Sequence, residues 1–268
     1  MKHLQKCIYA AILSLCGLGF LTSCSDDQDN NKRGKPLSEA ILGRWQTVEY
    51  DGEPAITDEK AILNFVSPTT CYMNMLLADN EEKGGWGHDI QFDMQIKGYT
   101  LTLFGIVNDD IAAIYEMQFT SVKANTMVCK MRTRTIVNGE EREDAYTVKF
   151  VRASATTDYN EQIVGIWEAD YWENAVFTRC RYEFKDDGTY SFYYLDAQGQ
   201  WQLAQDDYSY FFCDDNLVYM RWKNTGKEPQ CECWDIKRID QGVMTWHSRR
   251  SKGEGTAERT VEFTKVQN

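Results

Sequence analysis

The sequence predicts an all-β protein made of two tandem antiparallel barrels, each an up-and-down arrangement of eight strands. Apolar residues recur at every second position, and turn residues interrupt them roughly every eight to twelve positions, a pattern typical of a β-sandwich or barrel. Short motifs at the start and end of the first half recur in the second. With 43% apolar and 13% aromatic residues, the 268-residue chain can fill the cores of two domains.

The chain begins with a segment typical of a signal peptide. Lys2 and Lys6 precede an uninterrupted apolar run, 7–20, which is too short to span a membrane comfortably. The run ends in Leu-Thr-Ser-Cys at 21–24, which resembles a bacterial lipobox. This resemblance implies removal of 1–23 and acylation of Cys24, which then anchors the chain in a membrane.

The next residues, 24–37, are mostly polar and acidic and predict a flexible tether. Ser25 follows the lipidated cysteine where an aspartate would signal inner-membrane retention in some Gram-negative bacteria. The acidic run is similar to the surface-export tethers of Bacteroidota lipoproteins. These resemblances imply an outer-membrane protein at the cell surface, with a periplasm-facing orientation as the alternative.

An internal duplication divides the remaining chain. The opening motif Ile-Leu-Gly-Arg-Trp at 41–45 reappears as Ile-Val-Gly-Ile-Trp at 163–167, and the closing Thr-Val-Lys-Phe at 147–150 reappears as Thr-Val-Glu-Phe at 260–263. Both matches occur in the same order. We therefore predict one domain over 38–152, a linker over 153–162 and a second domain over 163–268.

Alternation and turn residues give the expected strands of the first domain, where Asn138-Gly139 is a strong hairpin signal. These strands cover 42–50, 60–66, 70–78, 89–97, 99–107, 112–122, 126–137 and 143–151. The only helical pattern is a short one at 37–42, which leads into the first barrel.

The second domain alternates more clearly. Around the turn Asp186-Asp187-Gly188, the residues Tyr182, Phe184, Tyr190 and Phe192 share one face and predict a hairpin with an aromatic inner side. The pattern gives one segment more than eight, so one of them is expected to be split or false. The segments are 163–172, 178–186, 189–196, 200–205, 207–213, 216–223, 230–239, 242–249 and 258–266.

Three motifs carry a family resemblance. The Gly-x-Trp at the start of both domains, the Phe-Lys-Asp-Asp-Gly-Thr-Tyr hairpin at 184–190 and the closing Val-x-Phe strands resemble the lipocalin-like domains of Bacteroidota lipoproteins. The resemblance implies that Trp45 and Trp167 close the bottoms of two barrels. The first domain has Ser-Pro-Thr-Thr at 67–70 in place of the hairpin motif, so an immunoglobulin-like sandwich is its alternative fold.

The residues give little support to catalysis. His88 and His247 are the histidines after the signal peptide, and neither has a second histidine or a cysteine at metal-ligand spacing. Adjacent carboxylates fall in expected turns, and no motif of hydrolases, nucleotide-binding proteins or metalloproteases is present. We therefore expect no enzyme, metal or cofactor. A formal net charge of −12 argues against nucleic acid as a partner.

The cysteines leave two possibilities open. Even numbers in each domain fit disulfides in an oxidising envelope, whereas buried free thiols are equally compatible with domains of this size. The connectivity of any disulfide cannot be read from the sequence. The residues are Cys71 and Cys129 in the first domain and Cys180, Cys213, Cys231 and Cys233 in the second.

The predicted function is non-enzymatic binding of a small apolar or glycan-like ligand inside a barrel. Residues 163–268 contain 20 aromatic residues and 41–152 contain 12, so the second barrel is the expected site. The residues expected nearest the ligand are Tyr182, Tyr190, Phe192, Trp201, Tyr210 and Trp222. The alternative is a structural or interaction lipoprotein whose barrels are filled and whose exposed aromatic residues dock an envelope protein.

Overall fold

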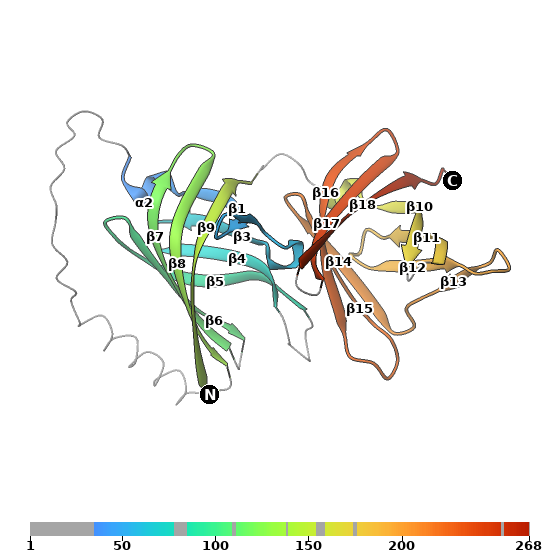
Figure 1. The fold of residues 1–268 in the computed structure, drawn as a ribbon, viewed down its shortest axis with the longest axis horizontal. Coiled ribbons are helices and arrows are strands. Elements are labelled where there is room, and N and C mark those ends of the chain that lie inside the picture. The colour runs from blue at the N-terminus through green and yellow to red at the C-terminus, as the bar shows by residue number, and fades with distance from the viewer. Residues whose placement is uncertain are drawn as a thin grey trace. The chain divides into compact units, whose positions relative to one another are not determined.

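The chain folds almost entirely into antiparallel strands (Figure 1). In this computed structural model the described residues are 35–77, 85–108, 111–137, 139–153, 159–173, 176–252 and 255–267. The predicted signal peptide, Cys24 and nearly all of the predicted tether lie outside these residues.

The first sheet is a closed barrel. Its strands follow one another around the sheet in chain order, and β1 pairs with β9 as well as with β3. The ladder that closes the barrel runs from the pair Trp45 and Arg152 to the pair Tyr50 and Val148. The elements are α2 (Leu37–Ala40), β1 (Gly43–Tyr50), β2 (Glu53–Pro54), η1 (Thr57–Glu59), β3 (Ala61–Ser67), β4 (Thr70–Leu77), β5 (Gly85–Lys97), β6 (Thr100–Asn108), β7 (Ile111–Val122), β8 (Thr126–Val137) and β9 (Glu140–Arg152).

This arrangement confirms the predicted eight-stranded barrel. The ninth strand of the sheet, β2, has two residues and pairs only with the end of β1. The hairpin between β3 and β4 turns between Ser67 and Thr70, which pair with each other, so this sequence replaces the missing Asp-Gly turn without a change of topology. The sandwich alternative for the first domain is wrong, because two separate sheets could not give a closed ladder.

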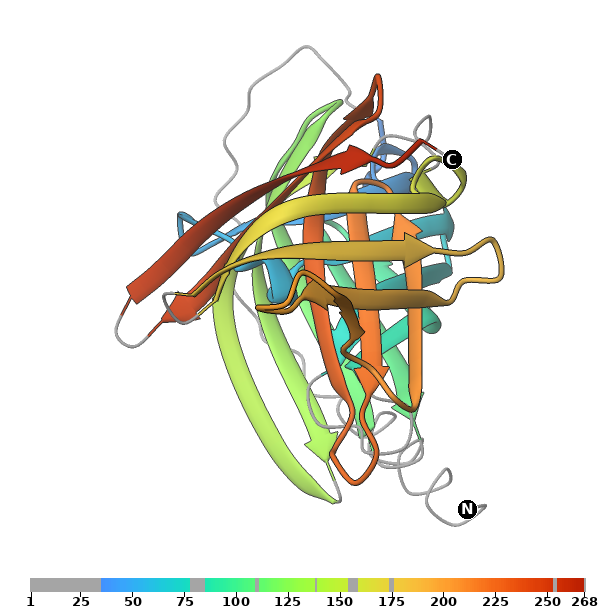
Figure 2. The ribbon, with the colours of Figure 1, turned by 90° about the vertical axis from the view of Figure 1, so that its right-hand side faces the viewer.

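The second sheet is curled but is not closed by a ladder. Its strand order is β13-β12-β11-β10-β18-β17-β16-β15-β14, and an isolated bridge connects Thr189, directly before β12, with Tyr210 on β14. In Figure 2 the yellow and ochre strands run in a different direction from the orange ones. The elements are α3 (Tyr159–Gln162), β10 (Gly165–Glu173), β11 (Val176–Phe184), β12 (Tyr190–Leu195), β13 (Trp201–Leu203), β14 (Tyr208–Asp214), β15 (Leu217–Lys223), β16 (Gln230–Asp240), β17 (Val243–Lys252) and β18 (Gly255–Lys265).

The second sheet therefore has nine strands where eight were expected. The additional strand is β13, which has three residues and pairs with β12 across a tight turn. Asp196 holds that turn, because its Oδ1 accepts hydrogen bonds from the backbone N–H groups of Gln198 (2.9 Å) and Gln200 (2.8 Å). The extra segment seen in the sequence was real and not a split strand.

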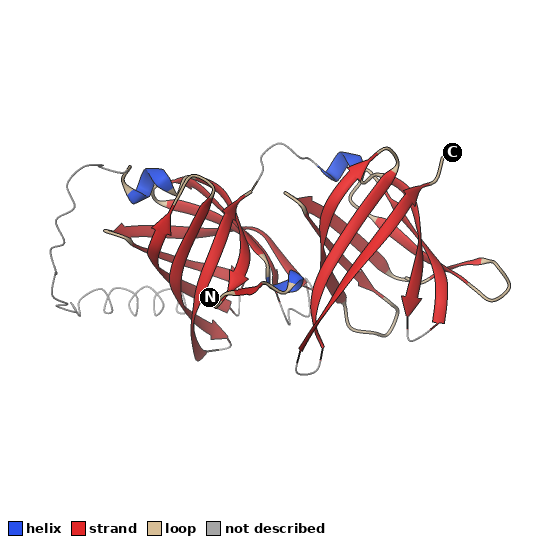
Figure 3. Ribbon diagram, turned by 45° about the horizontal axis from the view of Figure 1, so that its top comes forward, coloured by secondary structure: helices blue, strands red, loops and turns tan. Residues whose placement is uncertain are grey.

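Helices are confined to single turns in the described part of the chain (Figure 3). None of them has the length and apolar character that a membrane-crossing helix would need. The helix α2 was expected near Leu37. The helix α3 was not, since Tyr159–Gln162 falls within the range predicted as a linker, and it leads into Ile163, which is fully buried.

The two barrels have the same closed end. The indole Nε1 of Trp45 donates to the carbonyl of Ile41 (2.6 Å), and that of Trp167 donates to the carbonyl of Ile163 (2.7 Å), both four residues earlier. Both tryptophans are buried. The predicted equivalence of the two residues is confirmed.

A cation from the last strand covers each tryptophan. The guanidinium carbon of Arg152 lies 4.2 Å from the Trp45 ring centroid, and Nζ of Lys265 lies 5.0 Å from that of Trp167. Each cation also donates to a backbone carbonyl just before Gly43 or Gly165, at 2.9 Å in both cases. Both glycines have positive φ (105° and 130°), which other residues rarely adopt, so the motif requires glycine at this place.

The turn η1 connects the first barrel to the second within the compact unit Lys35–Asn268. The hydroxyl of Thr57 accepts from the backbone N–H of Arg249 (2.8 Å), and Asp58 Oδ1 accepts from that of Cys233 (2.9 Å). Lys60 Nζ lies 2.6 Å from a carboxylate oxygen of Asp235, which is buried. A small apolar cluster of Ile62, Phe212, Leu217, Tyr219 and Cys233 lies beside these contacts.

Candidate functional site

The first barrel contains a cavity of about 270 Å³. The closed end of the barrel is packed around Trp45 and Phe65, which are fully buried and do not line the cavity. The cavity therefore occupies the part of the barrel interior farther from Trp45, toward Tyr50 and Tyr146.

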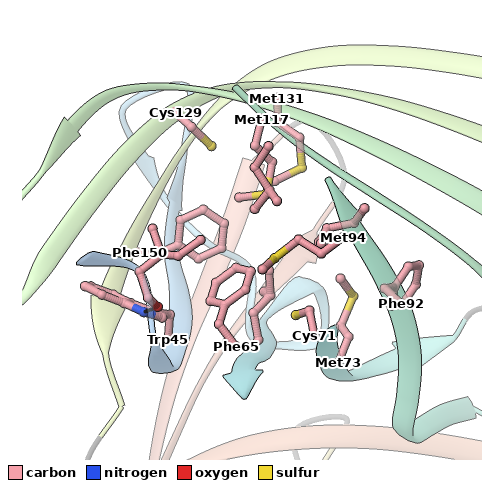
Figure 4. Close-up of a cluster of buried hydrophobic side chains, with 14 of the residues drawn as sticks. Trp45, Phe65, Cys71, Met73, Phe92, Met94, Met117, Cys129, Met131 and Phe150 are labelled. Carbon is pink, nitrogen blue, oxygen red and sulfur yellow. Dashed lines mark hydrogen bonds between the residues drawn. The ribbon is translucent and has the colours of Figure 1, made fainter. Parts of the chain in front are cut away.

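The floor of the cavity is apolar and rich in sulfur. Met73, Met117 and Met131 line it together with Leu63 and Leu103. Figure 4 shows the side chains of these three methionines pointing into the same interior as Phe65 and Phe150. Methionine side chains are flexible and polarisable, so such a floor can adapt to apolar ligands of different shape.

Small residues keep the space open. Ala61 and Ala113 line the cavity from β3 and β7, where a larger apolar residue would fill it. Both are buried, and Ala113 retains only 2% of its surface. The void is therefore a consequence of side-chain size at inward positions of a regular barrel.

Three tyrosines surround the upper part of the cavity. Tyr50 and Tyr146 meet edge to face with ring centroids 5.4 Å apart, and Tyr115 meets Phe92 in the same way at 5.5 Å. The hydroxyl of Tyr50 donates to the backbone carbonyl of Glu59 (3.0 Å), which ties the end of β1 to η1. The rings are thereby held at fixed positions around the space.

The environment of these three tyrosines raises their pKa values above the ordinary value near 10, at which a tyrosine is already neutral at physiological pH. Burial, followed by repulsion from Tyr146, raises the pKa of Tyr115 to about 12. Burial also raises the pKa of Tyr50 and of Tyr146. At physiological pH the hydroxyls of Tyr115 and Tyr146 can each donate one hydrogen bond and accept others, whereas the Tyr50 hydroxyl, which donates to Glu59, can only accept.

Charged and hydroxyl groups complete the rim. Thr47, Thr133 and Thr135 line the cavity, as do Glu59 and Arg134. Arg134 is paired with Glu141, with Nε 2.8 Å from a carboxylate oxygen. The site thus combines an apolar floor with a polar rim, an arrangement that can hold a small molecule with one polar end.

The interior of the second barrel, where the ligand was expected, contains a cluster of aromatic side chains at four of the six predicted positions. Tyr182 has its ring centroid 4.6 Å from that of Phe192 and 5.4 Å from that of Trp246, and it also contacts Phe263. Tyr190 belongs to the same buried cluster. The aromatic residues pack mainly against one another in this interior.

Two of the six predicted ligand residues lie on the outer face of the second sheet. Trp201 pairs with Leu195, and the guanidinium carbon of Arg181 lies 4.3 Å from its ring centroid. Arg181 is adjacent to the inward-facing Tyr182 and therefore faces outward. Trp201 therefore faces outward and not into the barrel, and its contact with a ligand stays a prediction.

Tyr210 also faces outward, since it is 47% exposed, while its neighbour Phe211 is 6% exposed and faces the core, so the contact of Tyr210 with a ligand stays a prediction. Three consecutive aromatic residues, 210–212, offer no alternation from which to read a face, so the sequence could not decide between them. The other predicted residues, Tyr182, Tyr190, Phe192 and Trp222, all contribute to the interior cluster.

The first-barrel cavity was not predicted from the sequence, because the larger number of aromatic residues in the second barrel favoured a ligand site there. Aromatic side chains fill a small barrel, whereas inward alanines and methionines leave room. The signal was present in Met73 and Met75, which lie two positions apart on one strand, and in Ala113, which lies at an inward position. Tyr50, Tyr115 and Tyr146 carried no signal of their own in the sequence.

The cysteines and histidines take positions that the sequence left open. Cys71, Cys129, Cys180, Cys213, Cys231 and Cys233 are free thiols. Burial raises the pKa of Cys71 and of Cys129 to about 12. His247 lies on β17, with Nδ1 3.7 Å from a carboxylate oxygen of Asp235, and the side chain of His88 lies outside the described residues.

Comparisons with known proteins give little further information. No family model matches the chain, and no curated protein is similar to it at the level searched. Among solved structures, the chain is similar to a crystal structure from Nitrosomonas europaea provisionally named AttH. The two are 9% identical, the match covers 87% of this chain and 98% of the other, and the TM-score is 0.23. A TM-score of 0.23 is too low to establish that the two chains share a fold.

Proposed function

We propose that this chain is a non-enzymatic lipoprotein of the cell envelope that binds a small, mainly apolar molecule in the cavity of its first barrel. The observation that carries the proposal is the cavity itself, which has an apolar floor of methionine and leucine and a rim of neutral hydroxyl groups. Its volume of about 270 Å³ lies just under the usual range for drug-sized ligands, which begins at roughly 300 Å³. The ligand is accordingly small.

The chemistry of the rim favours binding over catalysis. General acid or base catalysis works best when the pKa of the group is near the working pH. Burial moves the pKa values of Tyr50, Tyr115 and Tyr146 away from neutrality. The hydroxyls of Tyr115 and Tyr146 are suited to hydrogen bonding with a carbonyl or hydroxyl on the ligand, and that of Tyr50 can accept from a ligand hydroxyl.

A pair of neighbouring alanines on β7 provides the test. Ala113 lines the cavity, whereas Ala112 precedes it on the same strand and faces the other way. We expect Ala113→Phe to fill the space and to weaken binding of the apolar fluorophore 1-aminoanthracene at least tenfold, and Ala112→Phe to leave binding unchanged. The measurement is fluorescence titration. Equal binding by both variants, or no binding by the unaltered protein, would contradict the cavity as the site.

The membrane anchor is a separate part of the proposal. The lipobox-like sequence before Cys24 supports acylation of that residue and attachment to the outer membrane. We expect mass spectrometry of the native protein to find a mature chain that begins with acylated Cys24. We expect Cys24→Ser to move the protein out of the membrane fraction. An intact Met1 terminus, or a serine variant that stays with the membrane, would refute the anchor.

An interaction role is the second candidate for the second barrel. Its interior is filled by the cluster around Tyr182, and Tyr194, Leu203 and Tyr210 are exposed on its surface. A filled barrel with exposed aromatic residues fits a docking module better than a ligand carrier. Co-purification of one envelope protein that depends on Tyr194 or Leu203 would support this role.

A further inference from the structure

The second sheet has a groove at the seam where its ends meet. Beyond the bridge between Thr189 and Tyr210, β12 and β14 diverge, and the chain between Leu203 and Tyr208 passes between them. The resulting groove has a volume of about 370 Å³. One wall is formed by the outward-facing Tyr208 and Tyr210, and the buried Tyr190 borders the groove from the interior cluster of this barrel.

The backbone groups along this seam already have partners. The N–H of Phe211 donates to the carbonyl of Gly188 (2.8 Å), and that of Ala204 donates to the carbonyl of Phe192 (2.9 Å). The side-chain oxygen of Gln205 accepts from the N–H of Phe192 (2.9 Å). These bonds leave little for an extended peptide that would join the sheet through its backbone.

One wall of the groove is a pair of tyrosine rings. The centroids of Tyr208 and Tyr210 are 5.4 Å apart, and the planes are tilted by 32°. The guanidinium of Arg221 donates to the Tyr208 hydroxyl (2.8 Å), and its carbon lies 5.0 Å from the centroid of that ring. The orientation of Tyr208 is therefore fixed before any ligand arrives, which lowers the entropy lost on binding.

The other groups of the groove are polar. Asp206 and Asp207 contribute carboxylates, Thr189 and Ser191 contribute hydroxyls, and Lys185 contributes an ammonium group. Two carboxylates against one ammonium group disfavour an anionic ligand. Leu203 is the aliphatic residue of the described lining, which is too little for a lipid chain.

We propose that this groove binds a neutral glycan. A sugar ring has an apolar face of C–H groups, which packs on an aromatic ring, and a rim of hydroxyl groups, which need hydrogen-bond acceptors. Tyr210 presents an exposed ring for that face, and the carboxylates of Asp206 and Asp207 lie in the same groove to accept from the hydroxyls. This site is independent of the cavity in the first barrel.

The test measures binding of four neutral hexasaccharides by isothermal titration calorimetry. They are maltohexaose, cellohexaose, mannohexaose and xylohexaose. We expect at least one to bind, Tyr210→Ala to weaken that binding about tenfold or more, and Tyr210→Phe to retain most of it, because the ring supplies the contact. Asp207→Asn should weaken it as well, since a neutral amide accepts hydrogen bonds less strongly than a carboxylate. Tyr99→Ala is the matched control, because Tyr99 is 69% exposed on the first barrel.

Three results would overturn the proposal. The first is that none of the four oligosaccharides binds. The second is that binding survives the double variant Tyr208→Ala, Tyr210→Ala. The third is binding of a lysine-rich peptide that is lost in Tyr210→Ala, since this would identify the groove as a peptide site. Circular dichroism of each variant separates loss of the ring from loss of fold.

Discussion

The two barrels have the same structure at one end and differ in the side chains that occupy the rest of the interior. Each begins with a helical turn, a glycine with positive φ and a buried tryptophan covered by a cation from its last strand. Above that end, the first barrel has methionines and alanines around a cavity, and the second has a packed aromatic cluster. The shared end therefore determines the fold, and the inward residues in the rest of each barrel determine whether there is space for a ligand.

Closure differs as well. The ladder between β1 and β9 closes the first sheet, so its interior is enclosed by strands on every side. The second sheet is joined by one bridge and leaves a groove on its surface. A filled interior needs no complete wall to exclude water, whereas a cavity does. The first barrel therefore has a cavity inside its wall of strands, and the second sheet has a groove at its surface.

Replacement of the closing tryptophans should give the largest effect. We expect Trp45→Ala and Trp167→Ala each to lower the free energy of unfolding by roughly 3 to 5 kcal/mol, because each removes a large buried ring. Each also leaves a cation, Arg152 or Lys265, without the ring it covers. Guanidinium denaturation followed by circular dichroism would measure both. A loss under about 1 kcal/mol at either site would break the equivalence of the two barrels.

A matched pair of alanines should separate the two interiors. Ala113 borders the cavity of the first barrel, and Ala169 is buried in the packed cluster of the second. We expect Ala169→Leu to destabilise the protein by roughly 1 to 3 kcal/mol, since extra methyl groups overpack a filled core. Ala113→Leu should change stability by less than about 1 kcal/mol, since the void accommodates them. Equal costs in thermal unfolding would show that the interiors are packed alike.

Alkaline titration should give a smaller, graded difference. Burial raises the pKa of Tyr115 to about 12 and that of Tyr190 well above its ordinary value. A raised pKa in the folded state stabilises the fold below the ordinary tyrosine value, near 10, and this stability is lost as pH rises from there through the folded value. Tyr115→Phe should therefore remove an absorbance step at 295 nm near pH 12 and reduce the loss of stability between pH 10 and 12. Tyr190→Phe should leave that step in place, and its disappearance there would assign the step to the second barrel.

Much of the fold could be predicted from the sequence. Period-two alternation gave most strands to within a few residues, and the duplicated Gly-x-Trp placed Trp45 and Trp167 at equivalent ends. The strand β5 begins at Gly85, four residues before its predicted start at Asp89. The clearest error in topology was the assumption of eight strands in the second sheet, where a short Asp-held hairpin adds β13.

The candidate site was harder to predict, because a cavity is a difference between the space available and the side chains that fill it. Alternation identifies which residues point inward, but it does not sum their volumes. Ala113 and Met117 were visible as inward positions, yet nothing local distinguishes a void from a packed core. Adjacent aromatic residues were a second limit, since Tyr210 and Phe211 could exchange faces without any change in composition.

The turn η1 has a consequence for the order in which the protein folds. Thr57 and Asp58 are bonded to Arg249 and Cys233, residues that lie 192 and 175 positions later in the chain. The carbonyl that holds the Tyr50 hydroxyl belongs to the same turn. This turn at the rim of the cavity therefore gains all of its hydrogen-bond partners only after β16 and β17 of the second sheet have folded.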